Sequence, residues 1–128
     1  MGRKEMRRLE VRAWSEEHNR YCDFVTLDDI GRWVGWIETC KNFLTTMDII
    51  LEQYTGLKDK NGEEIYEGDI VAEHNGDIIG TIIQHPSGEW QIAWIGIFGG
   101  ASSLYDHRQW CEVIGDIHNN PELLERKK

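Results

Sequence analysis

The chain has 128 residues, of which 40% are hydrophobic, and a formal net charge of −9. These values suit one domain with a modest core, and the acidity argues against broad attraction to nucleic acid or anionic membranes. No run approaches the ~20 apolar residues of a membrane-spanning helix, and no apolar signal-peptide stretch follows the charged N-terminus. We therefore expect a soluble, intracellular protein.

The cysteines and the basic residues further limit the classes of protein to which this chain can belong. Cys22, Cys40 and Cys111 are odd in number and form no C-x-x-C pair, which argues against a disulfide scaffold and fits a reducing cytoplasm. Basic residues gather at the two ends of the chain, and none lies between residues 61 and 107. We interpret the N-terminal ones as solvated charge on an edge strand that discourages edge-to-edge pairing, with a local phosphate contact as the alternative.

The first half of the chain predicts strands around one ambiguous stretch. Residues 9–13 alternate between apolar and polar side chains, which indicates a half-buried strand, and residues 21–27 form a second strand that completes a hairpin. Residues 31–48 place aromatic side chains at near-helical spacing, but glycines and β-branched residues weaken the helix. We expect irregular structure or a short helix there, followed by a strand at residues 49–54.

The second half is marked by turn residues. Asn61-Gly62 and Asn75-Gly76 each predict a type I′ hairpin turn, because both central residues of that turn need positive φ. Strands are expected at residues 67–74, 77–85 and 90–98. Gly80 lies inside one of these strands and suggests a bulge or a sharp bend.

The chain closes with a last strand within residues 103–115 and a short helical turn that begins at Pro121. Seven or eight short strands at regular spacing predict a mainly β fold, with α+β as the alternative. We expect a small SH3-like, partly open barrel with an N-terminal hairpin and short helical segments. The expected single domain covers residues 1–128, with the hairpin and irregular or helical segment at 1–48, the barrel core at 49–117 and a tail at 118–128.

Three collinear segments carry a family resemblance. Residues 53–71, "QYTGLKDKNGEEIYEGDIV", resemble the signature segment of the YopX-like proteins of bacteriophages and prophages. Residues 10–21, "EVRAWSEEHNRY", and residues 110–125, "WCEVIGDIHNNPELLE", are similar to that family's terminal segments. The resemblance implies a phage or prophage protein of Gram-positive bacteria or their relatives, with a β-rich fold that forms oligomers. It implies no reaction, so no catalytic residue is carried over.

The signature segment has a structural interpretation. Gly56 and Gly62 serve turns, Gly68 lets the chain bend into a barrel strand, and Ile65 and Tyr66 contribute to the core. The residues that we single out in it are Tyr54, Thr55, Gly56, Asp59, Gly62, Ile65, Tyr66, Gly68 and Asp69.

No motif for catalysis, cofactor binding or metal binding stands out, so no catalytic residue, cofactor or metal is predicted. No two histidines have the spacing usual for zinc or iron ligands. A weaker alternative to solvated loop histidines is a metal site built from His74, His85, His107 and either Asp77 or Asp106. Cys111 beside Trp110 in a strand predicts a buried, inert thiol.

Two kinds of binding surface remain. Trp33, Trp36, Trp90 and Trp94 exceed what so small a core buries easily, so we expect them on an interaction surface for a second copy or for a phage or host protein. The alternative is that all six tryptophans are core or rim residues of a monomer. A nucleic-acid-binding barrel, with Trp90, Trp94 and Tyr105 stacking on bases, lacks a basic groove unless the N-terminal arginines cover it.

The resulting functional hypothesis is a non-catalytic phage accessory protein of the bacterial cytoplasm that acts through protein–protein interaction or self-assembly. A nucleic-acid-binding module is the alternative, and a small enzyme with an unrecognised site is the third choice.

Overall fold

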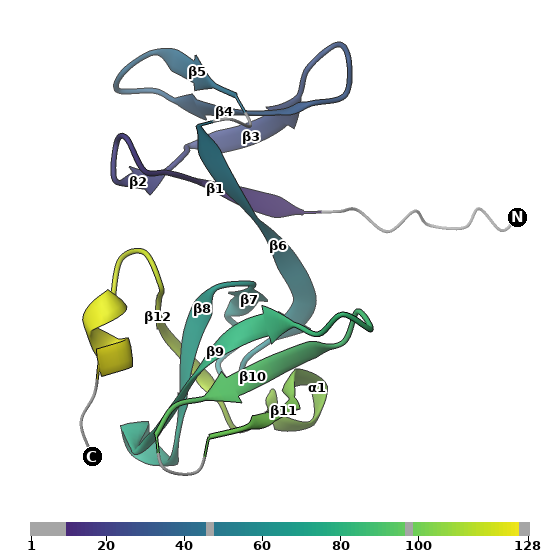
Figure 1. Cartoon of the computed structure of the whole chain (residues 1–128), viewed down its shortest axis with the longest axis vertical. Coiled ribbons are helices and arrows are strands. Elements are labelled where there is room, and N and C mark those ends of the chain that lie inside the picture. The colour runs from purple at the N-terminus through teal and green to yellow at the C-terminus, as the bar shows by residue number, and fades with distance from the viewer. Residues whose placement is uncertain (1–9, 46–47, 97–98, 126–128) are drawn as a thin grey trace, which may run out of the picture.

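The computed structural model of the protein describes residues 10–45, 48–96 and 99–125. These residues form a mainly β structure with two lobes, joined by the long strand β6 (Ile49–Lys58) (Figure 1). The N-terminal lobe contains β1 to β5 and the first half of β6, and the barrel lobe contains the rest. The predicted fold class is confirmed, because the barrel lobe is a curled, half-closed sheet.

A four-stranded antiparallel sheet connects the lobes. Its strand order is β2 (Arg20–Tyr21), β1 (Val11–Ser15), β6 and β7 (Glu64–Tyr66). The first half of β6 pairs with β1 and its second half pairs with β7. The predicted N-terminal hairpin is confirmed only in part. Tyr21 lies in β2, which pairs with β1, but residues 24–27 of the predicted second strand belong to a separate sheet. The strand predicted at residues 49–54 continues to Lys58.

The ambiguous stretch at residues 31–48 is a correction to our expectation. It forms β4 (Trp33–Ile37) and β5 (Asn42–Leu44). β4 pairs with β3 (Phe24–Leu27) on one side and with β5 on the other, in a three-stranded antiparallel sheet. Neither a helix nor a wholly irregular segment is present among its described residues. The near-helical spacing of its aromatic residues was misleading, because β4 is stabilised by pairing with β5 within the stretch and with β3 outside it.

Gly35 explains why this small sheet packs closely against β1. A Cβ atom on Gly35 would lie 2.5 Å from Sγ of Cys22 and 3.8 Å from Cβ of Ala13. The glycine that weakened the helix prediction therefore serves close packing within a strand.

The barrel lobe is a five-stranded antiparallel sheet that curls around its core. In spatial order its strands are β11 (Ala101–Ser103), β10 (Trp90–Trp94), β9 (Ile78–Gln84), β8 (Asp69–Glu73) and β12 (Glu112–Asp116). The helix α1 (Leu104–His107) follows β11, and Leu104 is fully buried. The helical turn predicted at Pro121 is confirmed as a 3₁₀-helix, Pro121–Glu125.

Separate apolar clusters stabilise the two lobes. The cluster inside the barrel consists of Ile65, Val71, Ile82, Ile92, Leu104 and Cys111. The cluster of the N-terminal lobe consists of Ala13, Ile37, Leu44 and Ile49. A third cluster, on β8 and β9, receives Leu123 and Leu124 from the C-terminal 3₁₀-helix. Part of the segment that we expected to be a tail therefore packs onto the barrel.

The loop between β6 and β7 differs from the predicted type I′ turn. Gly62 has a φ of 85°, but Asn61 does not have positive φ, and a type I′ turn requires both. Asp59 determines the loop instead. Its Oδ1 accepts the backbone N–H groups of Asn61 and Glu63 at 2.8 and 2.9 Å, and its Oδ2 accepts that of Val113 at 2.8 Å. This carboxylate holds a wider loop and attaches it to β12.

The second Asn-Gly pair and Gly80 also gave specific expectations. Asn75 and Gly76 both have positive φ, at 59° and 94°, but His74 does too, so β8 and β9 are joined by a longer, 3₁₀-like turn.

The bulge predicted at Gly80 is absent. The pairing of β9 with β8 and with β10 continues through Gly80 without a register shift. A Cβ atom there would lie 2.5 Å from Cγ2 of Ile92, so this glycine permits close packing and forms no bulge.

None of the helices formed by the described residues has the length and apolar character needed to cross a membrane.

Candidate functional site

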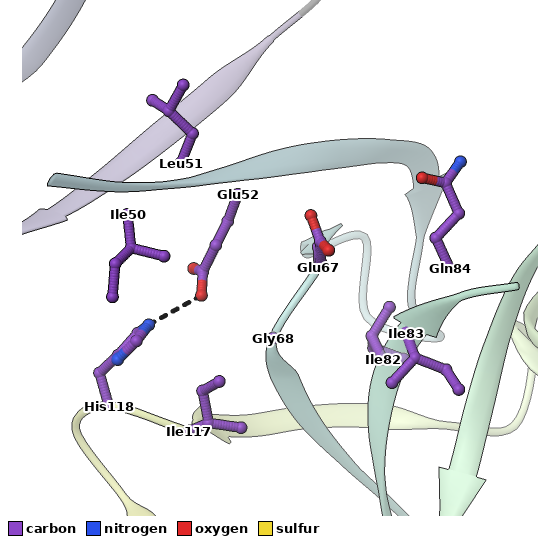
Figure 2. A pocket seen from close by; sticks show the side chains of 10 residues that line it. All are labelled: Ile50, Leu51, Glu52, Glu67, Gly68, Ile82, Ile83, Gln84, Ile117 and His118. Carbon is purple, nitrogen blue, oxygen red and sulfur yellow. Dashed lines mark hydrogen bonds and ion pairs between the residues drawn. The ribbon is translucent and has the colours of Figure 1, made fainter. Parts of the chain in front are cut away.

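A pocket of about 440 Å³ lies between the two lobes (Figure 2). Ile50 on β6, Ile83 on β9 and Ile117, just after β12, supply much of its apolar lining. Glu52 and His118 also line it, and Figure 2 shows their side chains pointing toward each other. The pocket therefore combines apolar walls with one acid–imidazole pair.

Glu52 is the centre of a buried polar network. Its Oε1 accepts hydrogen bonds from Nε of Arg12 and from the hydroxyl of Tyr21, both at 2.8 Å. Its Oε2 lies 2.8 Å from Nε2 of His118, whose ring stacks on Trp14 at 4.6 Å. Glu52 is 4% exposed, so these bonds replace the water that the carboxylate lost on burial.

Arg12 extends the network into the barrel lobe. Its Nη2 lies 2.8 Å from Oδ1 of Asp69, and Oδ2 of Asp69 accepts the backbone N–H of Tyr66 at 2.8 Å. The guanidinium is sandwiched between the rings of Tyr21 and Tyr66, at 4.6 and 4.8 Å from their centroids. One cation thus joins strands of both lobes through two carboxylates and two aromatic faces.

Burial changes the ionisation of these groups in a consistent way. Burial raises the pKa of Asp69, although Arg12 and the Tyr66 N–H act in the opposite direction. Burial alone would lower the pKa of Arg12, but Asp69, Tyr21 and Glu52 outweigh it and the pKa is raised. Burial, together with Glu52, also raises the pKa of Tyr21. Arg12 therefore stays charged and Tyr21 stays a hydrogen-bond donor.

The polar groups of this pocket are satisfied by one another. Both oxygens of Glu52 have donors, and the described residues leave no buried side-chain nitrogen or oxygen without a hydrogen-bond partner. The Ile side chains remain as the accessible lining, and Ile50 and Ile83 are 40% and 38% exposed. Chemically, the pocket suits an apolar side chain better than a substrate that needs proton transfer.

The sequence did not reveal this network. Arg12 and Glu52 are 40 residues apart, Arg12 and Asp69 are 57 apart, and Glu52 and His118 are 66 apart. The available signal was local: Arg12 lies between Val11 and Ala13, and Glu52 directly follows the apolar residues 49–51.

The four tryptophans of the predicted interaction surface lie in two places. Trp33 and Trp36 are on β4 in the N-terminal lobe, and Trp90 and Trp94 are on β10 in the barrel lobe (Figure 1). All four are half-buried. Trp90 and Trp94 pack against the barrel core, and Nε1 of Trp94 donates to Oγ of Ser102 at 2.9 Å.

Trp36 belongs to an aromatic row that the sequence did not indicate. Its ring lies between Phe24 on β3 and Phe43 on β5, with centroid distances of 6.3 and 4.5 Å. Phe24 and Phe43 are 50% and 55% exposed. The three rings cross the outer face of the three-stranded sheet, because Phe24 and Phe43 are the register partners of Trp36. We call Phe24, Trp36 and Phe43 the aromatic row.

The remaining residues of the signature segment have structural roles in the β6–β7 pair and the barrel core. Oγ1 of Thr55 donates to the carbonyl of Ile65 at 2.7 Å, and Ile65 is fully buried in the barrel core. The rings of Tyr54 and Tyr66 lie 5.3 Å apart across the β6–β7 pair. Gly56 has a φ of 85°.

The candidate metal residues do not come together. Nδ1 of His85 contacts Oγ of Ser87 at 2.9 Å, whereas Nδ1 of His107 lies 2.7 Å from Oε2 of Glu73. The described part of the chain contains no group of three or more histidine, cysteine or acidic side chains placed to hold a metal ion.

The position of Cys111 agrees with the predicted buried thiol, and the residues near it concern the alternative of nucleic-acid binding. Cys111 is fully buried, and burial raises the pKa of its thiol to about 11. The N–H of Lys60 donates to the carbonyl of Cys111 at 3.1 Å, so the backbone of the β6–β7 loop lies against the residue that follows Trp110. Trp110 and Tyr105 are 55% and 59% exposed.

Comparisons with known proteins agree with the resemblance in the sequence. The YopX protein family matches residues 10–125. The chain is also similar to a crystal structure of protein EF1440 from Enterococcus faecalis, with 28% identity over 91% of this chain and 97% of that one, and a TM-score of 0.60. No curated protein matches the chain. Since the family match covers most of its length, the chain belongs to the YopX protein family.

Proposed function

We propose that this protein is a non-catalytic phage or prophage accessory protein that acts in the bacterial cytoplasm by self-association. The aromatic row is the observation that carries the proposal. Two phenylalanines that are at least half exposed flank a tryptophan on a sheet face, and contiguous apolar surface of this kind marks interaction sites. Trp and Phe are also enriched in interface cores.

The surroundings of the row favour a second copy as the occupant. The exposed ion pairs Arg20–Asp23 and Lys41–Glu38 lie beside it, and Nε1 of Trp36 donates to Oε1 of Glu38 at 2.8 Å. An apolar centre with both charge signs at its rim is complementary to itself across a two-fold axis. The row therefore needs no partner of different chemistry.

The area that a stable interface buries determines how much of the outer face of the three-stranded sheet must take part in the contact. Completing the burial of one half-exposed Phe ring contributes about 1 kcal/mol. Stable interfaces bury roughly 800 Å² per partner, so the remainder of the face, including half-buried Val34 and exposed Thr26, has to join the contact.

Light scattering coupled to size exclusion tests the proposal. We expect a discrete oligomer that Phe43→Ser dissociates, whereas Tyr105→Ser, an equally exposed aromatic residue in the barrel lobe, leaves the mass unchanged. Added salt should strengthen the oligomer, because each copy carries −9 charges that repel the other copy. A monomeric wild type, or a Phe43→Ser oligomer of unchanged mass, contradicts the proposal.

Nucleic-acid binding remains the second candidate because the guanidinium of Arg108 stacks 3.8 Å from the ring centroid of Tyr105. The backbone of Lys60 also bonds to Cys111, the residue that follows exposed Trp110. Stacking aromatics beside basic groups suit a single strand. Binding of this kind weakens with salt, the reverse of the self-association prediction. A fluorescent oligonucleotide titrated with wild type, Lys60→Ala and Trp110→Ala at low and high salt distinguishes the two functions.

A further inference from the structure

Unpaired parts of two strand edges line one groove in the N-terminal lobe. β2 occupies the same edge of β1 only at Trp14 and Ser15, and the carbonyl of Ala13 accepts the N–H of Cys22. A groove of about 430 Å³ lies between the start of β1 and β3, and its lining includes Val11, Val25, Leu27, Trp33 and Tyr66. β1 pairs with β6 on its other side, and β3 pairs with β4. No strand pairing joins β1 to β3 among the described residues.

The backbone hydrogen-bond pattern shows which groups point into this groove. The N–H of Tyr54 donates to the carbonyl of Glu10, so even-numbered residues of β1 bond to β6 and Val11 points the other way. The N–H of Asp28 donates to the carbonyl of Arg32, so by the same alternation Val25 and Leu27 point away from β4. Peptide groups of three residues on two strands are therefore directed toward the groove.

The side chains define what kind of strand fits. Leu27 is 52% exposed, and together with half-buried Trp33 it offers an apolar wall. The charge at the other wall is negative. Glu10 and Tyr66 line the groove there, and the negative charges of Glu64 and Glu10 add to burial in raising the pKa of Tyr66. Neither acid has an ion pair within the described residues. An extended, basic segment with some apolar side chains is complementary to this groove.

The chain itself contains a segment of this composition. Residues 1–9, MGRKEMRRL, carry four basic residues, one acid and apolar side chains at Met6 and Leu9. At about 3.3 Å per residue, nine residues span about 30 Å, well beyond the length of β1 or β3. Residues 6–10 contain no Gly, Pro, Asn, Asp or Ser, so no turn chemistry favours folding the segment back into its own groove.

We infer that the groove between β1 and β3 binds residues 1–9 of a second copy as an added strand, and that two copies exchange these segments about a two-fold axis. The inserted strand takes the open peptide groups of Val11, Val25 and Leu27, and its arginines face Glu10 and Glu64. This inference rests on the proposed self-association, but it uses residues outside the aromatic row.

A charge exchange in the full-length protein tests the inference. Arg7→Glu with Arg8→Glu, and separately Glu10→Lys with Glu64→Lys, should each weaken self-association about tenfold or more, since like charges then face each other. An equimolar mixture of the two double variants should form a hetero-oligomer, measured by native mass spectrometry. Glu89→Lys with Glu112→Lys, which makes the same charge change on exposed acids of the barrel lobe, should have no such effect.

A backbone variant tests the strand pairing itself. Val25→Pro removes an N–H that points into the groove and leaves the β3–β4 ladder intact. It should weaken association, whereas Val25→Ala, which keeps that N–H, should weaken it less.

The outcomes separate this inference from the proposed function. If Phe43→Ser dissociates the oligomer but the charge reversals do not, the strand exchange is wrong and the aromatic row stands. A further variant carries all four changes, Arg7→Glu, Arg8→Glu, Glu10→Lys and Glu64→Lys, in one chain. If this variant associates normally while the mixture of the two double variants does not, the segment occupies its own groove and the exchange is again wrong. A monomeric wild type overturns both.

Discussion

The α-carbon of Gly68 lies directly against the carboxylate of Glu52, so that a Cβ atom on residue 68 would come within 2.6 Å of Oε2. Gly68 also has a φ of 89°, a conformation that side chains other than glycine adopt with strain. The carboxylate cannot move aside freely, because Arg12, Tyr21 and His118 hold it. The contact between the two lobes at Glu52 therefore requires a glycine at position 68.

Gly68→Ala is expected to lower the free energy of unfolding by about 3 kcal/mol, as backbone strain adds to a clash with a fixed carboxylate. Gly56→Ala is the matched control, because Gly56 has a φ of 85° but nothing lies within 4 Å of its Cβ position. It should cost about 1 kcal/mol. Urea unfolding measures both, and equal losses would contradict the role given to Glu52.

Arg12 and Glu52 should be strongly coupled. Glu52→Gln or Arg12→Met alone leaves a partner buried and incompletely paired, which costs about 3 kcal/mol in each case. The double variant should lose clearly less than the sum of the two, and the coupling free energy from a double-mutant cycle measures this difference. Additive losses would show that the ion pair contributes little. Arg32→Met with Asp28→Asn, an exposed ion pair, is the control, and its coupling should be small.

The thiols should differ in reactivity. Cys111 is fully buried with a pKa raised to about 11 by burial, so its thiol stays protonated at pH 8 and reacts with a thiol-specific reagent only after unfolding. Cys40 is exposed and should react first. Peptide mapping after alkylation of native and urea-unfolded protein identifies the modified residues. Rapid alkylation of Cys111 in the native protein would contradict the buried position.

Asp116 should make stability depend on acid pH. Burial alone would raise its pKa, but hydrogen bonds from Asn119 and from the backbone N–H of His118 lower it overall. A lowered native pKa stabilises the fold above the unfolded-state value of about 4, and this contribution disappears as the pH falls through the native pKa.

Asp116→Asn is therefore expected to be less stable than wild type near neutral pH, with a difference that shrinks on acidification below about pH 4. Unfolding at a series of pH values measures this convergence. Asp106→Asn removes the same charge at an exposed position and controls for the general effect of net charge. A stability difference that stayed constant with pH would contradict the assignment.

The barrel strands and the family could be read from the sequence, because their signals are local. Short apolar runs in β8 and β9, glycines in the turns beside them, and Pro121 at the start of a 3₁₀-helix each depend on residues close together in the chain. The signature segment also identified the family, since a turn glycine such as Gly62 and an Asp that closes a loop, Asp59, act within a few residues of each other.

Only the tertiary structure decided the rest. β4 became the central strand of a sheet because Trp36 pairs with Phe24, which lies outside the ambiguous stretch, and with Phe43 on β5. The two tryptophan pairs were separated because β4 and β10 belong to different lobes. Glu52, Arg12 and Asp69 met across 40 and 57 residues of chain. Such contacts depend on how the sheets pack, and side-chain spacing along a single strand carries no information about that packing.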